Sequence, residues 1–86
     1  MTSLLVSLCE EVEAMDPRGR TKVGFVLVDT EVLDGEEWLV YRVWATSLGV
    51  NFGRTLFVSA DGTRIEGEGI GPIRDAEELA RALEVM

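Results

Sequence analysis

The sequence contains no histidine, a single cysteine and only two prolines. Without histidine the chain lacks the commonest general base and the commonest metal ligand. This excludes a Ser-His-Asp triad, a Cys-His pair and a zinc site of the Cys/His type within one chain. One cysteine cannot form an internal disulfide, which agrees with a reducing compartment. We therefore expect no cofactor and no metal, and the composition favours a protein that is not an enzyme.

Basic residues and long apolar runs are also scarce. Lysine and arginine number 8 against 16 acidic residues, giving a formal net charge of −8. Such a charge argues against nucleic-acid binding, whose affinity comes mostly from neutralising phosphates. No apolar run approaches the ~20 residues that span a bilayer. The apolar segment 1–9 has no basic region before it, which argues against a cleaved signal peptide, so we expect a cytoplasmic protein without a membrane partner.

What is present is typical of one globular domain covering residues 1–86. The chain is 47% hydrophobic and 28% charged, which is too apolar for a disordered segment. Apolar residues at helical spacing predict a first helix over 3–15 and a last helix from about Asp75 to the C-terminus. Strands are predicted over 22–33, 36–48, 54–60 and 63–68. We interpret Gly67, Gly69 and Gly71 as turn residues, without assigning a role to each.

These elements predict an α+β fold, with a mainly antiparallel four-stranded sheet in the order α-β-β-β-β-α. Asp34-Gly35 predicts a two-residue turn between the first two strands, because both positions tolerate a positive φ. Such a turn pairs residues whose numbers sum to about 69. Phe25 then lies opposite Trp44, and Asp29 lies opposite Val40.

This register divides the first hairpin into two apolar faces. One face is aliphatic and contains Gly24, Val26, Val28, Leu39, Tyr41, Val43 and Ala45. The other face is aromatic and contains Phe25, Leu27, Trp38, Val40, Arg42 and Trp44, interrupted by the charges of Asp29, Glu31 and Arg42 itself. A strand that is apolar on both faces is normally covered on both.

The chain has only two short helices to cover these faces. If both pack on the aliphatic face, the aromatic face is left as an interaction surface. We therefore predict a protein-interaction module that forms a homodimer through the aromatic face. The alternative partner of this face is another protein. Two alternatives stay open: one helix covers each face, or the sheet curls over itself. The sequence also leaves open whether the hairpin lies at an edge, where it could pair with a second chain.

A second hypothesis places a small-ligand or enzymatic site on the same face. Asp29 and Arg42 would supply its polar groups, because the register makes them diagonal neighbours. The competing interpretation of Arg42 is an ion pair with Asp29, stacked on Trp44.

Two clusters of charge have simpler interpretations. The acids of segment 29–37 are interpreted as a solvated hairpin tip, because Leu33 stands where an oxygen ligand would be needed for a cation. Arg18, Arg20 and Lys22 concentrate basic charge in one loop. We interpret this loop as compensation for neighbouring acids, with docking of a phosphate or an acidic partner as the alternative.

Overall fold

A computed structural model describes residues 3–47 and 49–85 of the chain. The elements follow in the order α1 (Leu4–Ala14), β1 (Lys22–Leu33), β2 (Glu36–Ser47), β3 (Val50–Ser59), β4 (Ile65–Gly67), β5 (Gly71–Ile73) and α2 (Ala76–Ala82). The strands form one antiparallel sheet in the order β1-β2-β3-β4-β5. The predicted α+β fold is confirmed, with five strands instead of four.

The fifth strand was missed because its residues look like strand breakers. Pro72 lies in β5, which is an edge strand, and edge strands accept proline. The turn before it needs glycine: Gly69 and Gly71 have φ of +77° and +83°. Gly67 lies beneath the side chain of Ile70, where any Cβ would overlap it. Leu48 and Met86, which we placed in a strand and in the last helix, lie outside the described residues.

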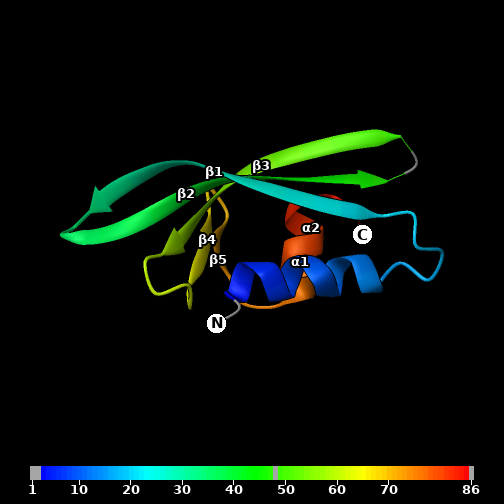
Figure 1. Cartoon of the computed structure of the whole chain (residues 1–86), viewed down its shortest axis with the longest axis horizontal. Coiled ribbons are helices and arrows are strands. Elements are labelled where there is room, and N and C mark those ends of the chain that lie inside the picture. The colour runs from blue at the N-terminus through cyan, green and yellow to red at the C-terminus, as the bar shows by residue number, and fades with distance from the viewer. Residues whose placement is uncertain (1–2, 48, 86) are drawn as a thin grey trace.

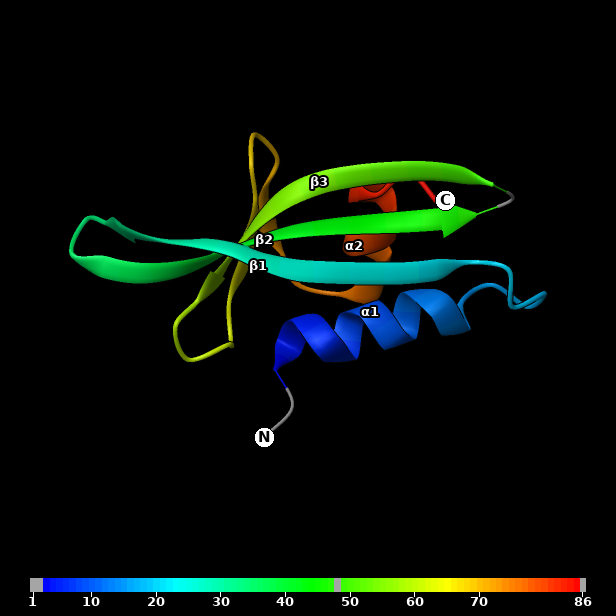
Figure 2. The ribbon, with the colours of Figure 1, turned by 45° about the horizontal axis from the view of Figure 1, so that its top comes forward.

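Both helices lie on the same side of the sheet (Figures 1 and 2). They pack on the aliphatic side of β2 and β3 around a core of Leu5, Leu8, Val12, Val43, Ala45, Leu56, Val58, Ile65, Ile73, Leu79 and Leu83. Arg54 projects to this side and donates from Nε to the carbonyl of Ala82 at 2.8 Å, which satisfies a carbonyl at the end of α2. Neither α1 nor α2 therefore covers the other side, which we call the outer face.

The register of the first hairpin changes halfway along β1. Asp34 and Gly35 have φ of 52° and 77°, which confirms the predicted turn. The predicted pairing holds near the turn, where Asp29 lies opposite Val40. An extra residue then interrupts β1 between Leu27 and Asp29, leaving Val28 without a partner in β2. This is a β-bulge, and it shifts every earlier pair by one residue.

The bulge overturns the pairing predicted for the first half of β1. Phe25 lies opposite Val43, not Trp44, and Leu27 lies opposite Tyr41, not Arg42. Because side chains alternate between the two sides of a strand, a shift of one residue moves each of them to the other side. Phe25 and Leu27 therefore belong to the helix side of the sheet.

Asp61 organises the turn between β3 and β4. One carboxylate oxygen accepts hydrogen bonds from the Ser59 hydroxyl at 2.6 Å and from the Thr63 hydroxyl and amide at 2.7 and 3.0 Å. These bonds, that of Ser59 foremost, lower the pKa of Asp61 from 3.8 to about 2. The amide of Leu4 donates to the carbonyl of Gly62 in the same turn, at 3.1 Å, and so fixes the start of α1.

We predict that Asp61→Asn lowers the free energy of unfolding at neutral pH and weakens its acid dependence. The folded-state pKa lies below the unfolded one, so the stabilising contribution is complete above pH 3.8. It is lost as the pH falls through about 2. Urea unfolding at pH 7, 4 and 2 measures the difference between the wild type and the variant. A difference that stays constant across this range would contradict the role given to the carboxylate.

Candidate functional site

The outer face carries only part of the predicted aromatic face. Trp38, Val40, Arg42 and Trp44 share it, because they alternate along β2 with the residues that contact the core. The other two predicted members, Phe25 and Leu27, lie on the helix side for the reason given above. The ring of Phe25 there makes an edge-on contact with the ring of Tyr41, with centroids 5.9 Å apart.

Other residues of the same chain cover the Trp38 end of the outer face. Trp38 and Val40 are only 6% and 7% exposed. The guanidinium carbon of Arg64 lies 5.1 Å from the centroid of the Trp38 ring, and Arg64 pairs with Glu36. A shallow hollow of about 490 Å³ beside them is lined by Leu33, Asp34, Glu36, Trp38, Phe57, Arg64 and Glu66. Trp38 and Val40 are thus structural residues of the single chain.

Arg42 and Trp44 lean away from each other. The indole of Trp44 lies over Gly24 of β1, where a Cβ would overlap it. The guanidinium of Arg42 lies over Gly53 of β3, where a Cβ would be 2.9 Å from Nη2. The predicted stacking of Arg42 on Trp44 is wrong, because the cation–π contacts of residues 3–47 and 49–85 involve Arg54 and Arg64 instead.

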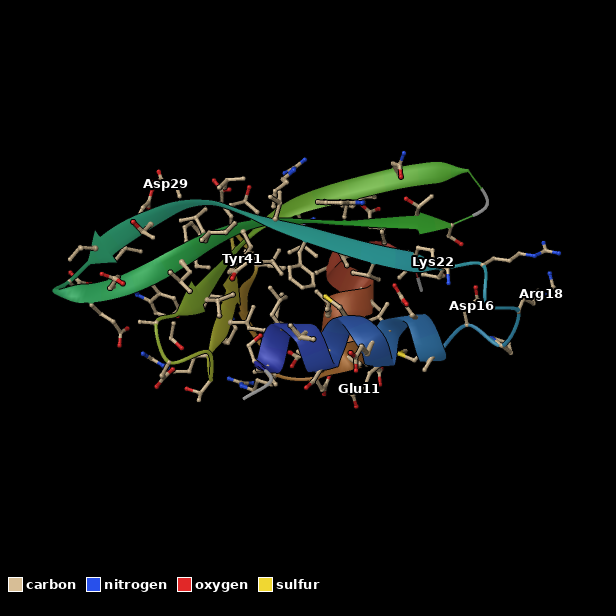
Figure 3. All side chains as sticks on the ribbon, viewed as in Figure 1. Glu11, Asp16, Arg18, Lys22, Asp29 and Tyr41 are labelled. Atoms are coloured by element: carbon tan, nitrogen blue, oxygen red, sulfur yellow. The ribbon has the colours of Figure 1, made fainter. Side chains whose placement is uncertain are left out.

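Asp29 and Arg42 are not brought together as a polar pair. Asp29 stays opposite Val40 and therefore diagonal to Arg42, but the ion pairs within the described part of the chain do not include one between Asp29 and Arg42. The Asp29 carboxylate accepts a hydrogen bond from the amide of Thr30 at 2.8 Å. Figure 3 shows Asp29 and Tyr41 on opposite sides of the hairpin. The ion pair of the competing interpretation is therefore absent from the described residues, whereas the ligand site stays a prediction.

The sequence left the position of the hairpin open, and the structure places β1 at an edge of the sheet. Four successive apolar residues of this strand are exposed, from 37% at Phe25 to 58% at Val28. The far end of the hairpin extends past both helices, as Figure 1 shows. A long apolar strand at an open edge is a template for pairing with another strand. We call segment 25–28 the open edge.

The hydrogen bond of Val23 reveals which backbone groups of β1 face outward. Its amide donates to Glu13 Oε2 of α1 at 2.8 Å, so it points away from β2. In an antiparallel pair, residues that face the neighbouring strand alternate with residues that face away from it. The amides of Phe25 and Leu27 therefore also face away from β2, where the sheet has no further strand. Beyond the bulge, the outward amides are those of Thr30 and Val32.

Glu13 protects this edge, a role that the sequence did not predict. Its carboxylate accepts a hydrogen bond from the Val23 amide, and the carboxylate of Asp29 accepts one from the Thr30 amide. We call these two amides occupied, and outward amides without such a bond open. The open edge thus has an occupied amide on each side of it. Glu13 was indistinguishable in the sequence from its acidic neighbours on the helix. Only the packing of α1 beside β1, which Figure 2 shows, brings it to the strand.

The acids of segment 29–37 lie along the tip of the first hairpin, and the basic loop lies between α1 and β1. Residues 3–47 and 49–85 contain no group of three or more acidic or cysteine side chains close enough to hold a metal ion. In the basic loop, Asp16 accepts hydrogen bonds from the amides of Arg18, Arg20 and Thr21 at 2.8–3.0 Å. These bonds, that of Arg18 foremost, lower the pKa of Asp16. The loop is therefore organised by an acid of the chain itself.

Comparison with known proteins adds no relative: no family model matches the chain, and no curated protein or solved structure is significantly similar to it. Among the described helices, none is long and apolar enough to cross a membrane.

We predict that Glu13→Ala accelerates hydrogen exchange of the Val23 amide by about tenfold or more, because a hydrogen bond to a charged group contributes ~1.5–3 kcal/mol. The amide of Val26, which faces β2, should exchange as in the wild type. Exchange followed by NMR measures both, and Glu10→Ala, an exposed acid of the same helix, is the matched control. An unchanged rate at Val23 would show that Glu13 does not protect the edge.

Proposed function

We propose that this chain is a non-enzymatic protein-interaction module that self-associates as a homodimer along β1. The observation that carries the proposal is the open edge, whose four apolar side chains are all 37% exposed or more. Single exposed apolar residues are ordinary on a protein surface. A contiguous apolar run with outward backbone groups has both side chains to bury and hydrogen bonds to complete.

The occupant that this edge fits best is a second copy of the chain. Lys22 begins β1, and Asp29 and Glu31 lie toward its other end. Figure 3 shows Lys22 and Asp29 at opposite ends of the strand. Two antiparallel copies of β1 place the basic end of each beside the acidic end of the other. Antiparallel pairing about a twofold axis also closes after two copies, which is the commonest symmetry of soluble oligomers.

The contact surface differs from the aromatic face expected from the sequence. Trp38 and Val40 are nearly buried within one chain, so they offer little surface to a partner. Trp44 is 37% exposed and lies over Gly24, so it adjoins the open edge and extends it onto the outer face. We also propose that the protein acts in the cytoplasm, which its single free cysteine supports.

We predict that Leu27→Pro converts the dimer into a folded monomer. Proline removes the outward amide of Leu27, which donates no hydrogen bond to β2, and edge strands accept proline at such positions. The matched control is Val26→Pro, which removes an amide that faces β2 and should destabilise the fold itself. Light scattering gives the mass of each variant, and circular dichroism reports its folding.

Leu27→Lys is a second variant that keeps the strand intact and adds a charge to the apolar edge. We expect it to be monomeric as well, because dimer formation would bury that charge next to apolar side chains. If both Leu27 variants fold and remain dimers, β1 is not the contact. If the wild type is a monomer throughout a dilution series, the proposed self-association is wrong.

A further inference from the structure

The pattern of open and occupied amides along β1 selects one register for the dimer. Phe25 and Leu27 have outward amides facing the open side of the sheet, whereas those of Val23 and Thr30 are occupied by Glu13 and Asp29. A stable pairing places open groups opposite open groups, because a buried amide without an acceptor is costly. Occupied amides need no partner and can lie opposite each other where the pairing ends.

Symmetry and charge leave two registers to compare. In a twofold antiparallel pair, one residue lies opposite itself at the axis, and opposite residues share a side of the sheet. Val28, the extra residue of the bulge, is skipped when positions along β1 are counted. An axis at Phe25 then places Lys22 opposite Asp29 of the second copy. An axis at Val26 places Lys22 opposite Glu31 of the second copy. Both registers bring opposite charges together across the strands.

The backbone groups distinguish these two registers. With the axis at Phe25, the open amide of Leu27 lies opposite Val23 of the second copy, whose amide is occupied by Glu13. With the axis at Val26, Phe25 lies opposite Leu27 of the second copy, and both amides are open. Val23 then lies opposite Thr30 of the second copy, and both amides are occupied. Only the register with its axis at Val26 places open amides opposite open amides and occupied amides opposite occupied amides.

We infer that two copies pair antiparallel along β1 about a twofold axis at Val26, forming one continuous sheet of both chains. This inference rests on the proposed self-association and specifies its partner and register. Phe25 of each copy exchanges backbone hydrogen bonds with Leu27 of the other copy, once on each side of the axis. Lys22 and Glu31 form ion pairs at the two ends, and the helices of both copies lie on the same side of the joint sheet.

Disulfide trapping of Val26→Cys tests the register. Val26 faces β2 with its own backbone groups, so the two copies of residue 26 form a non-hydrogen-bonded pair with Cα atoms about 4.5 Å apart. That separation lies within the range that a disulfide bridges. The native Cys9 does not compete, because it is buried in the core, and burial foremost raises its pKa to about 12.

Val32→Cys is the matched control, because Val32 is the more exposed side chain at 69%, against 47% for Val26. In the inferred register the two copies of residue 32 lie ~30 Å apart, counting about 3.3 Å per strand residue. Under mild oxidation we expect Val26→Cys to form covalent dimer faster by tenfold or more, on the order of the advantage that a paired thiol has over a free one.

Three outcomes overturn the inference at different levels. A dimer in which Val32→Cys crosslinks as fast as Val26→Cys leaves self-association standing and removes this register. Faster crosslinking of Phe25→Cys than of Val26→Cys moves the axis to residue 25. A wild type that stays monomeric in light scattering removes both the register and the proposed function.

Discussion

The β-bulge in β1 is the feature on which the arrangement of the hairpin depends. One extra residue between Leu27 and Asp29 turns the first half of the strand over relative to the second. Phe25 and Leu27 thereby join the helix side of the sheet, and Gly24 comes to lie beneath the indole of Trp44. Without this residue, two large aromatic side chains would lie opposite each other on the face that neither α1 nor α2 covers.

The bulge also sets the limits of the exposed edge. Natural proteins protect edge strands with bulges, charges and covering elements, and β1 has all three of these devices. The bulge lies at Val28, the charge of Asp29 follows it, and α1 supplies Glu13 at the other end. The segment between these devices keeps both its apolar side chains and its outward amides. The strand is thus protected on both sides of segment 25–28 but not within it, as a short and specific strand pairing requires.

The sequence predicted the elements better than their pairing. Asp34-Gly35 carries a local signal, because the conformation of a two-residue turn depends on these two residues alone, and the structure has this turn. The bulge has no such local signal, because residues 23–28 alternate acceptably in either register. One hint was present: Trp44 needs a small residue opposite it, and Gly24 provides this only in the shifted register.

The sequence predicted that apolar residues of the first hairpin form the candidate site, but it did not predict which of them lie at the surface. The excess of apolar surface on the first hairpin left open whether two short helices cover both of its faces, and in the structure segment 25–28 of β1 is exposed. The aromatic residues were the contact predicted from the sequence, but Arg64, which comes from a distant part of the chain, covers Trp38. The edge position of β1 and its contact with Glu13 depend on the order of strands and on helix packing. Neither is set by residues close together in the sequence.

The most direct measurement is amide hydrogen exchange at Phe25 and Leu27 as a function of protein concentration. Both amides face away from β2, so in a monomer they should exchange quickly while those of Gly24 and Val26 are protected. As the concentration rises and a mass near twice 9.5 kDa forms, pairing along β1 predicts that exchange at Phe25 and Leu27 slows. A dimer that forms while both amides still exchange at their monomer rates would contradict pairing through this edge.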